Sequence, residues 1–281
     1  MQKASYLGLS VAGFHRLSYR VWGAPAAKRT LLCMHGLSRN GQDFQRLAEV
    51  LAEAGWRVVA PDVVGRGDSD WARSAKVYGY PQYLADMNAL IARLEVESLD
   101  WLGTSMGGMA GMMLAGQPGT PIRRLILNDI GPFIPKASLE RIADYVGQPV
   151  SFADRDAAEA YARTTYASFG QLDDATWRLM TEVSFRRDAE GRFVLAYDPA
   201  IAEAFSGKPI EDLDLWPLWD KIEQPTLVLR GADSDLLLAE TAEEMTRRGP
   251  KAKLAVFQGC GHAPSLMEPQ QIETVKTWLE G

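Results

Sequence analysis

The sequence predicts an α/β protein in which a mostly parallel sheet is flanked by helices and interrupted by one inserted helical segment. Short apolar runs alternate with amphipathic stretches at helical spacing up to about residue 130, and this alternation resumes near residue 218. The apolar runs show little alternation of their own, which is typical of strands covered by helices on both faces. These observations favour a layered parallel sheet over an all-helical or an all-β protein.

The first part of the chain alternates strands with helices. The second predicted helix shows the pattern most clearly, because apolar residues at positions 84, 87, 90, 91 and 94 share one side and Pro81 suits its first turn. An opening strand region near residues 4–14 is followed by predicted strands at 17–22, 30–34, 57–60, 99–102 and 124–128. Predicted helices lie at 42–54 and 81–94, and a further helix-like run follows residues 103–107 and ends at residue 115.

The alternation stops between residues 131 and 217, where helical pieces rich in Ala, Glu, Arg and aromatic residues take over. The last part of the chain then adds strands at 226–229 and 253–257 and helices at 239–248 and 270–279. We therefore predict one core domain from residues 1–130 and 218–281, with residues 131–217 forming a helical cap.

Composition excludes several classes of function. Lys and Arg number 30 against 36 Asp and Glu, so the net charge is -6, the opposite of a surface that binds nucleic acid. No stretch approaches the ~20 apolar residues that span a bilayer, and residues 4–14 lack the cleavage site of a signal peptide. Cys33 and Cys260 lie in no disulfide pattern. A soluble cytoplasmic protein, monomer or homodimer, is expected.

Residues 103–107 read Gly-Thr-Ser-Met-Gly between a predicted strand and a predicted helix. This is the context of a nucleophile elbow, a sharp turn that exposes its central serine. A side chain at Gly103 or Gly107 would collide with neighbouring backbone, and the start of a helix favours developing negative charge. Ser105 is therefore the candidate nucleophile.

A serine hydroxyl needs a base to accept its proton, and histidine is the usual one. His262 lies after the last predicted strand in the Gly-rich run 259–264, which leaves its ring accessible. His35, directly before Gly36, is interpreted as a residue that shapes its loop, and His15 as an ordinary strand residue. His262 is therefore the candidate base.

An imidazole base needs a carboxylate that holds its tautomer. Asp233 and Asp235 follow the predicted strand at 226–229, and either can serve. Asp62, Asp68 and Asp70 also follow a strand, but the Pro- and Gly-rich run 61–69 indicates a structural turn.

These motifs resemble the α/β-hydrolase superfamily in kind and in order. The matching motifs are His-Gly at 35–36, Pro-Asp at 61–62 with Gly-Arg-Gly-Asp-Ser at 65–69, the elbow, the run 231–235, and Gly-His-Ala-Pro at 261–264. The chain looks most like bacterial carboxylesterase-like members with a helical cap. The resemblance implies an eight-stranded, mostly parallel sheet, Ser105 as nucleophile, His262 as base, and the backbone N–H groups of Leu37 and Met106 as oxyanion hole.

One position departs from the family. Its acid usually stands three residues after the glycine that ends the strand, and this chain has Ser234 there, with an aspartate on each side. Resemblance to a variant with a turn one residue longer favours Asp235 as the acid, with Asp233 as runner-up.

The resemblance implies a serine hydrolase that cleaves a carboxylic ester with a small or medium acyl group, or a lactone, through an acyl-enzyme. Haloalkane dehalogenases and epoxide hydrolases share this architecture but carry an aspartate at the elbow, so Ser105 disfavours both. Three alternatives stay open: a carbon–carbon bond hydrolase of ring-fission products, an acyltransferase, and a receptor-like fold that only binds its ligand.

No cofactor or metal is expected, and a small-molecule ester is the expected partner. Arg186 and Arg187 fall in the predicted cap. A charged pair on a helix face is usually solvated, and the alternative is that the pair holds a substrate carboxylate.

Overall fold

The computed structural model describes residues 1–206 and 209–281. Its central sheet has eight strands in the order β1-β2-β4-β3-β5-β6-β12-β13. The pairs β1–β2 and β2–β4 are antiparallel and the remaining neighbours are parallel, which confirms the predicted fold class. The strands of this sheet are β1 Gln2–Ser10, β2 Gly13–Trp22, β3 Arg29–Met34, β4 Trp56–Pro61, β5 Leu99–Thr104, β6 Ile122–Asn128, β12 Thr226–Gly231 and β13 Lys253–Phe257.

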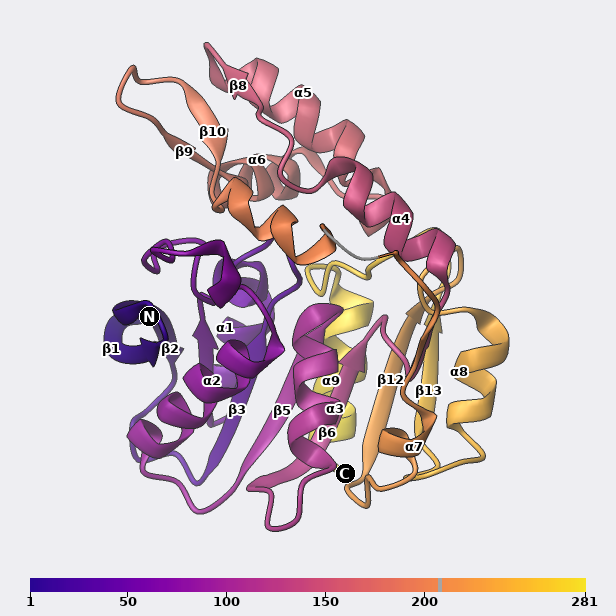
Figure 1. The fold of residues 1–281 in the computed structure, drawn as a ribbon. Coiled ribbons are helices and arrows are strands. Elements are labelled where there is room, and N and C mark those ends of the chain that lie inside the picture. The colour runs from indigo at the N-terminus through magenta and orange to yellow at the C-terminus, as the bar shows by residue number, and fades with distance from the viewer. Residues whose placement is uncertain (207–208) are drawn as a thin grey trace.

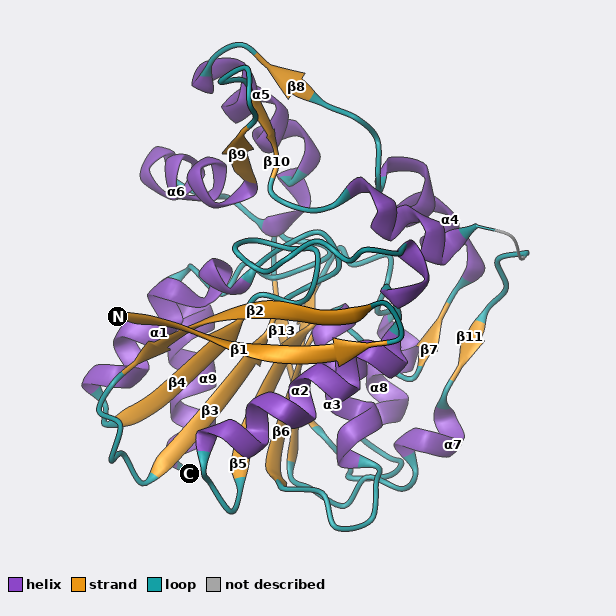
Figure 2. Cartoon of the chain, turned by 60° about the vertical axis from the view of Figure 1, so that its left-hand side comes forward, coloured by secondary structure: helices purple, strands orange, loops and turns teal. Residues whose placement is uncertain are grey.

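Helices cover both faces of the sheet (Figures 1 and 2). One apolar cluster packs α1 and α9 against one face, and a second packs α2, α3, α7 and α8 against the other. The interior strands are buried along nearly their whole length, as expected for a sheet enclosed between two layers. These helices are α1 Gln45–Glu53, α2 Tyr80–Leu94, α3 Met106–Ala115, α7 Trp216–Trp219, α8 Ala239–Met245 and α9 Pro269–Glu280.

The segment between β6 and β12 lies over the carboxyl ends of the parallel strands (Figure 1). Its helices are α4 Lys136–Tyr145, α5 Arg155–Thr165 and α6 Asp174–Ser184. It also contains strands, in a small sheet of β8 Ser151–Phe152, β10 Phe193–Leu195 and β9 Phe185–Arg187, and in the pair β7 Phe133–Ile134 with β11 Leu213–Asp214. Helical pieces were expected in this segment and these strands were not, because strands this short leave no alternation to detect.

Short 3-10 helices lie between the other elements of the described chain. They are η1 Gly41–Phe44, η2 Ala75–Val77, η3 Ala167–Phe169 and η4 Pro199–Phe205. None of the described helices is long and apolar enough to cross a membrane.

Candidate active site

Ser105 stands at the turn between β5 and α3, in a conformation that few residues adopt. Its φ is 50° and its ψ is -113°, in a left-handed region that costs free energy for a residue with a side chain. The turn is tight because β5 and α3 nearly touch. A Cβ atom at Gly103 would lie 2.2 Å from the Gly107 carbonyl carbon, and one at Gly107 would lie 2.0 Å from the Met34 oxygen. The glycines thus permit the elbow that the sequence predicts.

His262 contacts the serine as expected. Its Nε2 atom lies 3.0 Å from Ser105 Oγ, within hydrogen-bond distance. The loop that carries it joins β13 to α9 and is held by η3: the Gly261 N–H donates to the Ser168 carbonyl at 2.7 Å, and Ser168 Oγ donates to the His262 carbonyl at 2.7 Å. The imidazole is thereby fixed beside the hydroxyl.

The carboxylate that supports His262 is Asp129, which the sequence reasoning missed. Asp129 Oδ2 lies 2.7 Å from His262 Nδ1. The side chain is fully buried and accepts two further hydrogen bonds, from the Gly231 N–H at 2.8 Å and from the Ser234 hydroxyl. Ser105, His262 and Asp129 form one continuous hydrogen-bonded chain.

The expectation that Asp235 or Asp233 supports His262 was wrong. Asp235 is exposed and pairs with Arg141, with Nε at 2.6 Å and Nη2 at 2.9 Å from its two oxygens. Asp233 is exposed as well. Of residues 233–235, the loop after β12 buries only Ser234, whose hydroxyl binds the carboxylate that follows the neighbouring strand β6.

A signal for Asp129 was present in the sequence. Asp129 directly follows the predicted strand at 124–128, at the carboxyl edge where functional side chains of parallel sheets gather. The strand order explains why Asp129 can reach His262, because β6 lies between β12 and β5, and Ser105 directly follows β5. Each of these three strands therefore contributes to the same site.

The amides of Leu37 and Met106 are available as hydrogen-bond donors. Met106 is the first residue of α3, so its N–H has no acceptor within the helix. The Leu37 N–H meets no acceptor among residues 1–206 and 209–281. The fully buried Arg66 fixes this region, since its Nε donates to the Leu37 carbonyl at 2.9 Å and its Nη2 lies 3.8 Å from Met106 Sδ.

Comparison with known proteins decides the family. A family model for the alpha/beta hydrolase fold matches residues 29–269, which is most of the chain. The chain belongs to the α/β-hydrolase fold family. The resemblance on which the sequence analysis relied is thereby confirmed.

Three relatives of this α/β hydrolase are similar to it over nearly their whole length. A 3-hydroxybutyrate-oligomer hydrolase of Cupriavidus necator is 44% identical over 281 residues, covering 97% of this chain and 96% of that protein. A crystal structure of an alpha/beta hydrolase from Novosphingobium aromaticivorans has a TM-score of 0.89 at 36% identity, covering 99% of this chain and 98% of that one. A crystal structure of a protein from Rickettsia typhi has a TM-score of 0.92 at 34% identity, covering 100% and 99%. The expected enzyme class, a hydrolase of ester bonds, is confirmed.

His35 shapes its loop in this α/β hydrolase, as interpreted from the sequence. It lies 2.7 Å from the Gly36 carbonyl through Nδ1 and accepts from the Val63 N–H at 3.0 Å through Nε2, so the neutral ring with hydrogen on Nδ1 satisfies both contacts. Burial lowers the pKa of His35 to about 3. His15 lies on β2 and contacts the buried Asp86 at 3.0 Å.

Two cavities of the hydrolase meet at Ser105, and both are lined by Leu37, Ser105 and Ile142. The arginine cavity, of about 300 Å³, also contains His262 and two cations, Arg39 and Arg141. The apolar cavity, of about 340 Å³, has no charged residue in its described lining. Its further lining residues include Met106, Met109, Ile130, Leu139, Phe205 and Leu236.

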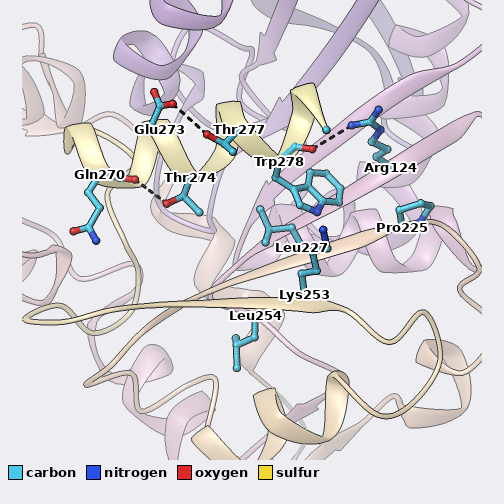
Figure 3. A pocket seen from close by; sticks show the side chains of 11 residues that line it. Arg124, Pro225, Leu227, Lys253, Leu254, Gln270, Glu273, Thr274, Thr277 and Trp278 are labelled. Atoms are coloured by element: carbon cyan, nitrogen blue, oxygen red, sulfur yellow. Dashed lines mark hydrogen bonds between the residues drawn. The ribbon is translucent and has the colours of Figure 1, made fainter.

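A hollow of about 970 Å³ lies away from Ser105. Figure 3 shows it between α9 and the amino ends of β6, β12 and β13, at the opposite edge of the sheet. Polar side chains there bond to α9 itself, as Arg124 does to the Trp278 and Leu279 carbonyls. In the described part of the chain, no three His, Cys, Asp or Glu side chains are grouped to hold a metal ion.

Arg186 and Arg187 line neither cavity. They lie on β9, not on a helix, and stack on Trp71 and Phe193 at 4.4 and 4.2 Å from the ring centroids. Both cysteines are free and buried, and burial raises the pKa of Cys260 to about 11. The expected cytoplasmic location and the monomeric or dimeric state stay predictions.

Proposed function

We propose that this protein hydrolyses carboxylic esters through an acyl-enzyme, with Ser105 as nucleophile, His262 as general base and acid, and Asp129 as the carboxylate that orients His262. The observation that carries the proposal is the continuous contact from Ser105 Oγ through both ring nitrogens of His262 to Asp129. An imidazole held by a carboxylate at Nδ1 presents an unprotonated Nε2 to the hydroxyl, as proton removal requires.

In the first half of the reaction Ser105 Oγ attacks the ester carbonyl carbon while His262 Nε2 takes the hydroxyl proton. The carbonyl oxygen becomes an oxyanion beside the amides of Leu37 and Met106. When the tetrahedral intermediate collapses, the bond from carbon to the alcohol oxygen breaks and His262 returns its proton to that oxygen. The products are a free alcohol and Ser105 in ester linkage to the acyl group.

In the second half His262 removes a proton from a water molecule, which attacks the acyl carbon. The same two amides stabilise the second oxyanion, and the bond to Ser105 Oγ breaks as His262 protonates it. A carboxylic acid leaves and the serine is restored. Asp129 keeps its charge throughout and stabilises the imidazolium that forms twice in each cycle.

For substrate class we propose short oligoesters of a hydroxy acid, of the 3-hydroxybutyrate type. Support comes from the Cupriavidus necator relative, which is 44% identical over nearly the whole chain. The two cavities that meet at Ser105 fit this class, because an ester inside a short chain extends in both directions from the carbonyl under attack. Their sizes suit small or medium groups on each side.

The test compares wild type with Ser105→Ala on a p-nitrophenyl ester series from acetate to decanoate and on the dimer and trimer of 3-hydroxybutyrate. Ser10→Ala, at the last residue of β1, is the control. We expect hydrolysis by wild type and the control and a loss of at least about a thousandfold in Ser105→Ala. Full activity in Ser105→Ala contradicts the proposal. If the wild type cleaves none of these esters, the result favours a carbon–carbon bond hydrolase, an acyltransferase or a receptor instead.

A further inference from the structure

The two cavities beside Ser105 differ in charge, and this difference predicts the polarity of the substrate. The described lining of the arginine cavity holds two arginines and no Asp or Glu. The apolar cavity is lined mainly by aliphatic, methionine and aromatic side chains. An ester bound at Ser105 therefore has an environment for a negative charge on one side only.

The position of His262 decides which part of the ester lies on that side. His262 lines the arginine cavity, whereas Met106, whose amide faces the oxyanion, lines the apolar cavity. Because His262 must protonate the departing alcohol oxygen, the alcohol part of the ester lies against it. The arginine cavity is thus the place of the leaving group, and the apolar cavity the place of the acyl group.

Of the two cations, Arg39 is already committed within the protein. Its side chain is 5% exposed, and it donates through Nε at 2.8 Å and Nη2 at 2.6 Å to Asp43 and through Nη1 to Ser184. Its guanidinium also stacks on Tyr166 at 4.6 Å. Each of the three guanidinium nitrogens of Arg39 therefore already donates to an acceptor within the protein.

Arg141, on α4, is differently placed. Its side chain is 44% exposed, and it uses Nε and Nη2 to hold Asp235. Within residues 1–206 and 209–281 its Nη1 group has no acceptor. Asp235 fixes the plane of the guanidinium at the edge of the cavity, and both N–H groups of Nη1 remain for an anion.

We propose that Arg141 binds a carboxylate on the alcohol part of the ester, so that the enzyme selects esters whose leaving group is a hydroxy acid with a free carboxylate. This inference rests on the proposed function and deepens it. An oligomer of a hydroxy acid has one free carboxylate, at the end whose hydroxyl is esterified to the rest of the chain. Bound this way, it is cut at that end and releases one free hydroxy acid per turnover.

The experiment compares two substrates that differ only in charge: the dimer of 3-hydroxybutyrate with its free carboxylate, and the same dimer as its primary amide. The measured quantity is the ratio of kcat/KM for the acid to kcat/KM for the amide. The variants are Arg141→Gln and Arg141→Lys. Arg155→Gln is the matched control, because Arg155 is also half exposed in the segment between β6 and β12, is paired with Glu182 at 2.8 Å and lines neither cavity.

Wild type and Arg155→Gln are expected to prefer the acid by about tenfold or more, mainly through a lower KM, since a charged hydrogen bond contributes that much. Arg141→Gln should lower the ratio to near one, and Arg141→Lys should retain part of it. Because the ratio cancels any general loss of activity, a less stable variant still gives an answer. An unchanged ratio in Arg141→Gln overturns the inference, whereas hydrolysis that survives Ser105→Ala overturns the proposed function instead.

Discussion

Asp129 is held by more than its contact with His262. Its carboxylate is fully buried, and its two oxygens are shared among the imidazole, the Gly231 amide and the Ser234 hydroxyl. Its own N–H donates to the Leu229 carbonyl at 2.8 Å. A buried charge needs such partners, and here they also fix its direction. The loop after β12 thus supports the acid without supplying it.

Replacing Asp129 with Asn should lower kcat for ester hydrolysis by about a thousandfold or more. An amide cannot stabilise the imidazolium and favours the wrong tautomer of His262. Asp233→Asn is the control, because this exposed carboxylate takes no part in the hydrogen-bonded chain. Steady-state kinetics on one p-nitrophenyl ester decides the matter: equal losses in both variants would argue against Asp129.

At the scale of residues, Ser105 and His262 were predictable because each sits in a local motif that its chemistry requires. Asp129 was not predicted, since it follows β6 and not β12, after which the family resemblance places the acid, and only the strand order shows that β6 and β12 are neighbours. Asp129 and His262 are 133 positions apart, so the sequence alone does not show that they are in contact.

The elbow at residues 103–107 positions Ser105, and its close packing against β3 leaves no room for a side chain at Gly107. The first turn of α3 lies so close to β3 that a methyl group at Gly107 would meet the Met34 and His35 carbonyl oxygens at 2.0 and 2.9 Å. Neither is the end of a flexible side chain. The backbone of two elements would have to separate before any larger residue fits.

Gly107→Ala should therefore lower the free energy of unfolding by about 3 kcal/mol or more, or prevent folding. Gly79→Ala is the matched control, because a Cβ there has its nearest neighbour at 3.7 Å and its φ of -178° is open to any residue. Its stability should stay within about 1 kcal/mol of wild type. Urea unfolding compares the three proteins, and a stable Gly107→Ala protein would refute the steric argument.

His35 makes the turn after β3 sensitive to acid. Its pKa is about 3 in the folded protein and ~6.5 in the unfolded chain, so the unfolded chain binds the extra proton between these values. The free energy of unfolding therefore falls as pH drops below ~6.5, by up to about 1.4 kcal/mol per pH unit from this one group. Above pH ~6.5 His35 is neutral in both the folded and the unfolded state, so it adds no pH dependence to the free energy of unfolding.

His35→Gln keeps a donor and an acceptor but removes the titration. Measured by urea unfolding between pH 5 and 6.5, its stability should depend on pH less steeply than that of wild type by about 1 kcal/mol per pH unit. Other titrating groups contribute equally to both proteins and cancel. Parallel pH profiles would show that His35 does not carry this dependence.

Elements of the core were predictable because their apolar periodicity is set by burial in a layered sheet. The two- and three-residue strands between β6 and β12 were not, since their pairing depends on partners far along the chain, such as Val194 with Ser151. The helix predicted at 239–248 ends earlier, at Met245.

Across the whole molecule, the segment between β6 and β12 is joined to the loops that carry the site. Ser168 binds the His262 loop, and Asn40 Nδ2 donates to the Val183 carbonyl at 2.6 Å. The turn that carries Arg66 is held in the same way, since the Gly67 N–H donates to the Ala196 carbonyl at 2.8 Å. A shift of this segment would therefore reach both the base and the oxyanion donors.

Ser168→Ala should lower the free energy of unfolding by about 1 kcal/mol and kcat by less than about tenfold, because the hydroxyl contact to His262 is lost while the backbone contact to Gly261 stays. Thr164→Ala, which removes a hydroxyl bonded only within α5, is the control for kcat. A kcat equal to that of the control would show that η3 does not help to position the base.

The most direct test of the central claim is mass spectrometry after treatment with a fluorophosphonate, which reacts chiefly with activated serines. Wild type should gain a single adduct, located on Ser105, while Ser105→Ala should gain none and Asp129→Asn should react far more slowly. An adduct on another residue, or wild type that hydrolyses esters yet leaves Ser105 unlabelled, would contradict the account.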